Sequence, residues 1–261
     1  MFKHVPFLLT LLIAGFLLNL PPALASDLAK EKRMKDQIID YIMDGEAKLL
    51  KDGSHDFLSI YMESEIQPSK GAVIIMHGRG YHPDWPELVN PLRTGLPQHG
   101  WDTLSIQMPL LNNESSFYDY LEILHEAHPR INAAVDFLKK KNTNNIVLLA
   151  HSCSVHMSID WLHKHPDAGA TAYIGVGMGS TDIGQPMLAP FPLQDIKIPL
   201  LDIRGEYDYP AVIAKAPARL KRMQIAGHPK SQQRVVKKSD HYFTERGEAL
   251  LIEVADWLNK L

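Results

Sequence analysis

The chain has 261 residues, 45% of them hydrophobic and 22% charged, and this balance excludes an intrinsically disordered protein. Its formal net charge of −3 excludes the strong positive footprint of a protein that binds nucleic acid or an anionic membrane surface. The length suits one large domain with a single hydrophobic core.

The N-terminal segment has the pattern of a secretory signal peptide. Lys3 precedes the apolar run VPFLLTLLIAGFLLNL, and Ala23-Leu24-Ala25 fits the small-residue cleavage site of such signals. An uncleaved anchor is the alternative, but the run is short for a membrane span. We therefore expect a signal peptide over residues 1–25 and a mature chain from Ser26, periplasmic or secreted, with no stable membrane anchor.

The mature chain is expected to be one domain, 26–261, that begins with an amphipathic helix over 27–43. The segments EAKLLK and DFLSIYMES flank Asp52-Gly53, which predicts a β-hairpin. Short apolar runs then predict strands at 71–78, 102–109, 145–152, 170–179, 198–208 and 233–240. Helix patterns lie between most of them, at 84–98, 116–141, 153–165, 210–225 and 244–260. Apolar strands that alternate with helices indicate an α/β fold, a mostly parallel central sheet with helices on both faces and an antiparallel start.

Ser152 stands between a predicted strand and a predicted helix, which is the setting of a nucleophile elbow. The usual elbow is Gly-x-Ser-x-Gly, whereas Ala150 and Ser154 occupy the glycine positions here. Both replacements are small, so the strand and the helix can still approach closely. The alternative is that Ser152 only caps the helix that starts at Cys153.

Two further residues fall at the ends of later strands. Asp208 stands in a turn at the end of the run 198–208, past the strand IPLLDIRG, and His241 follows the last strand, immediately before the C-terminal helix. Reacting groups of parallel α/β sheets gather at the carboxyl ends of the strands, and the order Ser, Asp, His is that of a hydrolase triad on such a sheet. Asp202 is a rival for the acid, but it lies inside its strand, so Asp208 is preferred.

Backbone N–H groups near Ser152 provide a predicted oxyanion hole. The turn His77-Gly78-Arg79-Gly80 follows an early strand, and the N–H of Gly78 or Arg79 is one expected donor. The N–H of Cys153, the residue after the nucleophile, is the other.

With these motifs in order, the chain resembles an α/β-hydrolase from the hairpin at 46–63 to the last helix. Within that superfamily, the segment GAVIIMHGRGYHPDWPELVNPLRTGLPQHGWDTLSIQMP is similar to an uncharacterised bacterial branch with no assigned substrate. The resemblance implies a triad in which Ser152 is the nucleophile, His241 the general base and then acid, and Asp208 the group that orients the imidazole. It implies no external cofactor.

Three functions are compatible with this pattern. The leading hypothesis is an exported serine hydrolase that cleaves a small-molecule carboxylic ester through an acyl-enzyme. A thioesterase, amidase or acyltransferase would use the same triad. A noncatalytic binding or scaffold domain that retains the fold is the alternative from another class. No nucleic-acid partner is expected, and the sequence assigns no oligomeric state.

Two other kinds of site, a thiol nucleophile and a metal site, are disfavoured. Cys153 is the only cysteine, so no internal disulfide forms, and we expect a buried thiol rather than a nucleophile. The histidine pairs His125/His128, His151/His156 and His163/His165 have no convincing carboxylate or cysteine set beside them, so no metal site is predicted.

The interval 180–197 is too short for a separate lid domain. Its three prolines predict an ordered loop. Met187, Leu188 and Phe191 are expected to offer an apolar wall beside Ser152 for a short or bulky acyl group, with a plain connector as the alternative.

Export should yield a mature N-terminus at Ser26, because the apolar run ends in a small-x-small site rather than in a charged stop-transfer flank. N-terminal sequencing of the exported protein measures this directly. A full-length species that stays in the membrane fraction after alkaline washing would show that the run is an anchor.

Overall fold

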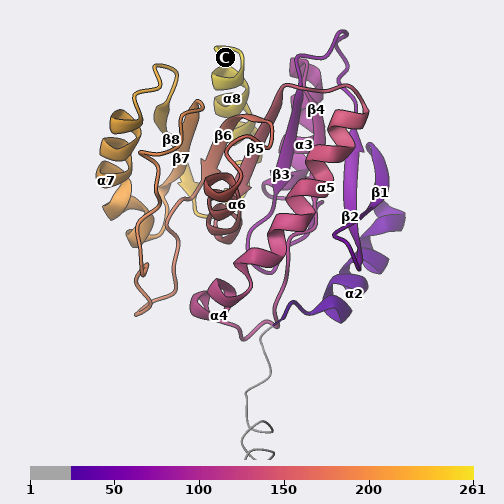
Figure 1. Ribbon diagram of the computed structural model, residues 1–261, viewed down its shortest axis with the longest axis horizontal. Coiled ribbons are helices and arrows are strands. Elements are labelled where there is room, and N and C mark those ends of the chain that lie inside the picture. The colour runs from indigo at the N-terminus through magenta and orange to yellow at the C-terminus, as the bar shows by residue number, and fades with distance from the viewer. Residues whose placement is uncertain (1–24) are drawn as a thin grey trace, which may run out of the picture.

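The computed structural model describes residues 25–261 (Figure 1). The predicted signal peptide therefore lies outside the described residues, apart from Ala25. Over the described range, no helix combines the length and apolar character that crossing a bilayer requires.

One sheet forms the centre of the fold, with eight strands in the order β1-β2-β4-β3-β5-β6-β7-β8 among the described residues. β1 pairs antiparallel with β2, and β2 antiparallel with β4, whereas all the later pairs are parallel. The predicted α/β sheet with an antiparallel start is thus confirmed. The strands are β1 Glu46–Lys51, β2 Asp56–Met62, β3 Ala72–Met76, β4 Asp102–Ile106, β5 Ile146–His151, β6 Ala170–Val176, β7 Leu200–Tyr207 and β8 Gln232–Asp240.

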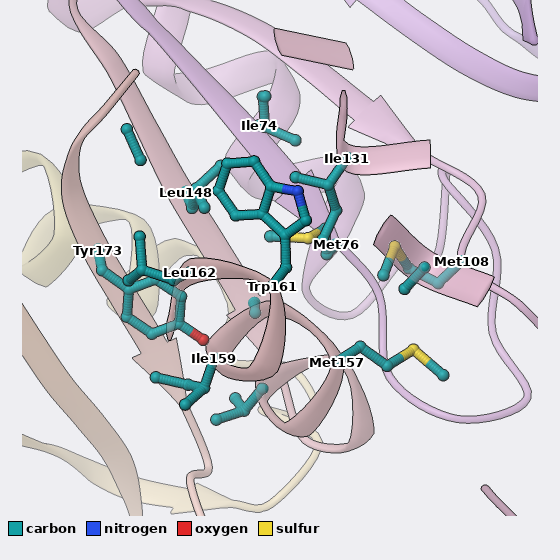
Figure 2. Packing of buried hydrophobic residues seen from close by; sticks show 14 of the residues in the cluster. Ile74, Met76, Met108, Ile131, Leu148, Met157, Ile159, Trp161, Leu162 and Tyr173 are labelled. Atoms are coloured by element: carbon teal, nitrogen blue, oxygen red, sulfur yellow. The ribbon is translucent and has the colours of Figure 1, made fainter. Parts of the chain in front are cut away.

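Helices cover both faces of this sheet. Successive side chains of a strand point to opposite faces, so each strand contributes residues to two core clusters. Ile74 and Leu148 lie in one core cluster with α5 and α6, whereas Val73 and Val147 lie in a second cluster with α3 and α8. Figure 2 shows Trp161 of α6 within the first cluster. The α-helices are α2 Leu28–Ile38, α3 Val89–Gly95, α4 Phe117–Glu122, α5 Ala127–Lys140, α6 Cys153–Lys164, α7 Pro210–Ala226 and α8 Gly247–Leu258, with 3-10 turns η2 Ile39–Tyr41, η3 Leu96–His99 and η4 Leu124–Glu126.

Two predicted helices differ in the structure, and prolines explain both differences. The segment 84–98 becomes helical only at Val89. Pro86 disfavours helical backbone at Trp85, and residues 86–88 form a turn before the helix. The segment 116–141 is divided at Ile123, whose φ of −108° and ψ of 10° leave the helical region. Pro129, without an N–H, is tolerated in the first turn of the new helix α5.

The loop 180–197 contains no helix or strand, so no lid domain is inserted after β6. Figure 1 shows it descending between the end of β6 and the start of β7. The carboxyl ends of β5, β7 and β8, which carry the predicted site residues, are therefore not covered by an added domain.

A buried ion pair fastens α7 to the sheet. Asp202, fully buried in β7, accepts a hydrogen bond from Nε of Arg219 at 2.7 Å and one from Nε2 of Gln233 at 2.7 Å. Arg219 also donates to the carbonyl oxygen of Val212, at 3.0 Å. Asp202, the rival for the triad acid, is thus an internal ion-pair partner of a helix.

Arg219→Met should destabilise the protein by about 3–5 kcal/mol, because it leaves the buried carboxylate of Asp202 without its cation. The free energy of unfolding from urea titration measures this. Lys221→Met, which replaces an exposed cation on the same helix, is the matched control and should change stability by less than about 0.5 kcal/mol. Equal stability of the two variants would show that the buried pair is not needed.

Candidate active site

Ser152 occupies the sharp turn from β5 into α6. Its φ of 54° and ψ of −115° lie in a region that an L-residue adopts only at a cost of about 1–3 kcal/mol. Its side chain forms no capping hydrogen bond to α6 within the described structure. The helix-cap alternative therefore does not account for this serine, whose hydroxyl is free for another partner.

The two residues that replace the usual glycines fit the elbow. Ala150 is fully buried at the end of β5. Ser154, in the first turn of α6, donates a hydrogen bond from Oγ to the carbonyl oxygen of His77. The serine thus ties the elbow to the turn that follows β3, a contact that glycine would not make and that sequence reasoning missed.

The structure brings Ser152, His241 and Asp208 into one hydrogen-bonded chain. Nε2 of His241 lies 2.9 Å from Oγ of Ser152, and Nδ1 of His241 lies 2.6 Å from Oδ1 of Asp208. Both His241 and Asp208 are buried. With the proton on Nδ1 donated to the carboxylate, Nε2 is left as the acceptor of the serine proton.

Asp208 is itself held by backbone donors. Its Oδ1 accepts the N–H of Tyr209 at 2.7 Å, and its Oδ2 accepts the N–H of Gly205 at 3.3 Å. These bonds aim one carboxylate oxygen at the imidazole of His241 without the help of a second acid.

Two glycines make room for this chain of residues. A Cβ on Gly177, whose φ is +64°, would lie 2.8 Å from Cε1 of His241. A Cβ on Gly78 would lie 2.7 Å from Nδ1 of His151 and 3.4 Å from Cβ of Ser152. Gly78 was a candidate from the sequence, whereas Gly177, directly after β6, was missed.

The candidate oxyanion donors lie around the serine. Gly78 packs against Ser152, and Arg79 follows it in the chain. Cys153 is the first residue of α6, and the first N–H groups of a helix have no partner within it and carry the positive end of its dipole. An anion bound beside Ser152 would thus be placed at the N-terminus of α6.

A small cavity opens onto Ser152. Its volume is about 50 Å³, which holds about three or four water-sized groups. The cavity is lined by Arg79, Tyr81, Phe117, His151, Ser152, Cys153, Ser180, Thr181, Asp182, Tyr209, His241 and Tyr242.

An ion pair closes one side of this cavity. Arg79 donates two hydrogen bonds to Asp182, at 2.9 and 2.5 Å, and these bonds lower the pKa of the Asp182 carboxyl. Asp182 also accepts the N–H of Phe117, at 2.6 Å, so it joins the turn after β3, the loop after β6 and the start of α4. Neither Asp182 nor Phe117 was identified from the sequence, although Asp182 follows a strand end closely.

Met187, Leu188 and Phe191 do not line the cavity at Ser152. They line a separate groove of about 240 Å³, together with residues of α4 and α6. The expected apolar wall is displaced because the Arg79–Asp182 pair holds the first residues of the loop at the cavity. Phe117 lines both hollows and stands between them.

Burial disfavours the charged forms of His77 and His151, two histidines beside the elbow. Burial lowers the pKa of His77 to about 3 and holds the pKa of His151 well below its usual value. Nε2 of His77 accepts the N–H of Met108 at 2.9 Å, and Nε2 of His151 lies 3.0 Å from the carbonyl oxygen of His241. These rings hold backbone in place rather than carry charge.

Cys153 is buried, as expected, and burial raises the pKa of its thiol to about 12. A thiol with so high a pKa supplies almost no thiolate near neutral pH. No group of three or more histidine, cysteine or acidic side chains is placed to hold a metal ion within residues 25–261.

Three tyrosines, also missed from the sequence, line the cavity on the side of His241. The ring of Tyr209 stacks on the imidazole with a centroid distance of 4.2 Å and an interplanar angle of 15°. The hydroxyl of Tyr209 is hydrogen-bonded to that of Tyr242, and Tyr81 packs edge-on against Tyr242 at 6.0 Å. Two of the three directly follow a predicted triad residue in the chain, which is the signal that could have found them.

Several solved structures with this architecture are called hydrolases or esterases in their names. The protein is similar to Est1E from Butyrivibrio proteoclasticus, at 13% identity and a TM-score of 0.62, over 82% of this chain and 98% of that one. A dienelactone hydrolase from Anabaena variabilis matches at 22% identity and a TM-score of 0.62, over 82% and 96% of the two chains. An α/β serine hydrolase without lid from Xanthomonas campestris matches at 11% identity and a TM-score of 0.60, over 84% and 95%.

At these identities the likeness shows the fold, which is that of the α/β-hydrolases. No curated protein matches the sequence. The family described as "Protein of unknown function (DUF3530)" matches over residues 21–119 and 119–260, nearly the whole chain. The chain therefore belongs to the DUF3530 family and has the α/β-hydrolase fold.

Proposed function

We propose that this protein is an exported serine hydrolase that cleaves carboxylic esters through an acyl-enzyme. The observation that carries the proposal is the hydrogen-bonded chain from Ser152 through His241 to Asp208, with distances of 2.9 and 2.6 Å. The three residues come from three strand ends that are far apart in the chain and close together in the fold. Export rests on the signal-peptide pattern of residues 1–25.

In the first half of the reaction, Oγ of Ser152 attacks the acyl carbon while Nε2 of His241 accepts the serine proton. The carbonyl oxygen becomes an oxyanion, and the N–H groups of Cys153 and of the Gly78-Arg79 turn stabilise it. Asp208 keeps the imidazole oriented and stabilises its cation. His241 then gives its proton to the leaving alcohol, and the acyl group remains on Ser152.

In the second half, a water molecule attacks the acyl carbon as His241 accepts one of its protons. The tetrahedral intermediate collapses, the proton passes to Oγ of Ser152, and the carboxylic acid leaves. A thioester or amide would follow the same steps with another leaving group, and an acyl acceptor other than water would make the protein a transferase.

The strained backbone of Ser152 argues against the noncatalytic scaffold. A serine in this conformation destabilises the fold, and its side chain forms no cap to α6 in the described structure that would offset the cost. Strain of this kind is typical of residues whose position serves a reaction.

The size of the cavity supports a small acyl group as the preferred substrate. A space of about 50 Å³ accepts a group near the size of acetyl or propionyl. A longer acyl chain would need the neighbouring groove of about 240 Å³, in which Met187, Leu188 and Phe191 supply apolar surface. Phe117 stands between the two spaces, so it limits the chain length.

Ser152→Ala and His241→Ala should each lower kcat/KM by about 10³-fold or more, and the double variant by little more, because the residues act as one unit. Ester hydrolysis and labelling by a fluorophosphonate probe measure this. Asp208→Asn should lose most of the activity, because it favours the wrong imidazole tautomer.

Asp202→Asn is the matched control for Asp208→Asn, since Asp202 is a buried carboxylate of the same strand region that pairs with Arg219 instead. A folded wild-type protein that neither hydrolyses esters nor takes up the probe would favour the scaffold alternative. Strong loss of activity in a folded Asp202→Asn protein, with none in Asp208→Asn, would reassign the acid.

Short-chain p-nitrophenyl esters should be hydrolysed faster than long-chain ones, with no jump in rate above the solubility limit. Phe117→Ala should raise kcat/KM for hexanoate relative to acetate by roughly tenfold, because joining the cavity to the groove lets about two of the additional methylenes leave water, at about 0.8 kcal/mol for each one fully buried. Tyr118→Ala, the neighbouring aromatic residue that lines neither space, is the control. An unchanged ratio in Phe117→Ala would show that the groove does not receive the acyl chain.

A further inference from the structure

His241 is enclosed by aromatic rings that the reaction scheme above does not use. Tyr209 lies nearly parallel to the imidazole, at 4.2 Å and 15°, so its ring face covers the face of the histidine. Tyr242 presents an edge-on contact at 5.3 Å and 78°. His151 lies at 5.0 Å with a tilt of 38°.

Tyr209 is fixed at three points. Its backbone N–H donates to Oδ1 of Asp208, the same oxygen that contacts Nδ1 of His241. Its hydroxyl is hydrogen-bonded to the hydroxyl of Tyr242. It is also the residue before Pro210, at the start of α7, where the proline restricts its backbone to extended conformations. The backbone of Tyr209 is thus held beside Asp208, and its ring cannot turn away from the imidazole without breaking the hydroxyl bond to Tyr242.

The surroundings of His241 suit the ring face of Tyr209 to stabilise a positive charge on the imidazole. Asp208 lies at Nδ1, and Ser152 lies at Nε2. Burial keeps the pKa of His151 well below its usual value, so that ring adds no positive charge. Burial and the hydrogen bond with Tyr242 raise the pKa of the Tyr209 phenol, which stays neutral. A neutral aromatic face attracts a cation stacked on it.

We infer that Tyr209 is a positioning residue for His241, whose ring holds the imidazole toward Ser152 and stabilises the imidazolium formed when His241 accepts a proton. The kinetic consequence rests on the proposed function. The effect on the protonation of His241 is independent of that function, because it is a property of the resting protein.

The test compares Tyr209→Leu, which removes the aromatic face, with Tyr209→Phe, which keeps it and loses only the hydroxyl. Tyr207→Leu, two residues earlier and 65% exposed, is the matched control. The imidazole signal of His241 is followed by NMR titration in each full-length mature protein and is assigned by its loss in His241→Gln. The rate of fluorophosphonate labelling of Ser152 is measured on the same samples.

In Tyr209→Leu, the titration midpoint of the His241 signal should move to lower pH by about half to one pH unit, because the protonated ring loses a stabilising contact. Labelling of Ser152 should slow by roughly three- to thirtyfold. Tyr209→Phe and Tyr207→Leu should stay within about twofold of the wild type in rate and should titrate like it.

Two results would overturn the inference. One is an unchanged midpoint in a folded Tyr209→Leu protein. The other is a loss in Tyr209→Phe as large as that in Tyr209→Leu, which would assign the effect to the hydroxyl pair rather than to the ring face. Failure of the wild type to react with the probe would reject the proposed hydrolase, while the titration would still decide the role of Tyr209.

Discussion

The backbone conformation of Ser152 is the constraint around which the elbow is arranged. Its positive φ reverses the chain between β5 and α6 and costs about 1–3 kcal/mol, so neighbouring contacts have to hold it. Ser152 donates its N–H to the carbonyl oxygen of Val176 at the end of β6, at 2.9 Å. Ser154 binds the turn after β3, and Gly78 leaves the space that a side chain would occupy. The strained residue is thus connected to both strands that flank β5.

Burial sets the electrostatics of the same region. His77 and His151 are kept neutral by desolvation, and Arg79 is paired with Asp182. The carboxylate of Asp208 is therefore the charge in direct contact with His241. In a site of low dielectric, one correctly placed carboxylate stabilises an imidazolium more than it would in water. The neutral rings of His77 and His151 pack at the site and add no positive charge beside the imidazolium.

Helix α6 connects the proposed catalytic site to the neighbouring groove. Ser152 and Cys153 lie at its N-terminus, while His156, Ile159 and His163, spaced three and four residues apart, line the apolar groove from one face of the helix. The ring of His156 lies between Phe117 and Phe191, at centroid distances of 4.9 and 4.8 Å. Ser152, the proposed nucleophile, and one wall of the groove are therefore held by the same helix.

Much of the architecture follows from local patterns in the chain. The alternation of apolar strands and helices predicted the parallel sheet, because strands buried on both faces must be apolar throughout. The chain order of Ser152, Asp208 and His241 at strand ends predicted their proximity, since carboxyl ends of parallel strands meet at one edge. The interruptions of two helices were missed although Pro86 and Pro129 signal them, because the helical periodicity continues across both sites.

The contacts between loops could be decided only by the tertiary structure. Met187, Leu188 and Phe191 were placed beside Ser152 by their position after β6, but the pair of Arg79 with Asp182 holds the preceding residues at the cavity and moves these three into the groove. The stacking of Tyr209 on His241 likewise depends on how α7 starts against the end of β8. The sequence determined which groups stand at the strand ends, since periodicity and order are local properties. Which side chains surround those groups was decided by tertiary packing, because it joins residues far apart in the chain whose pairing no local pattern encodes.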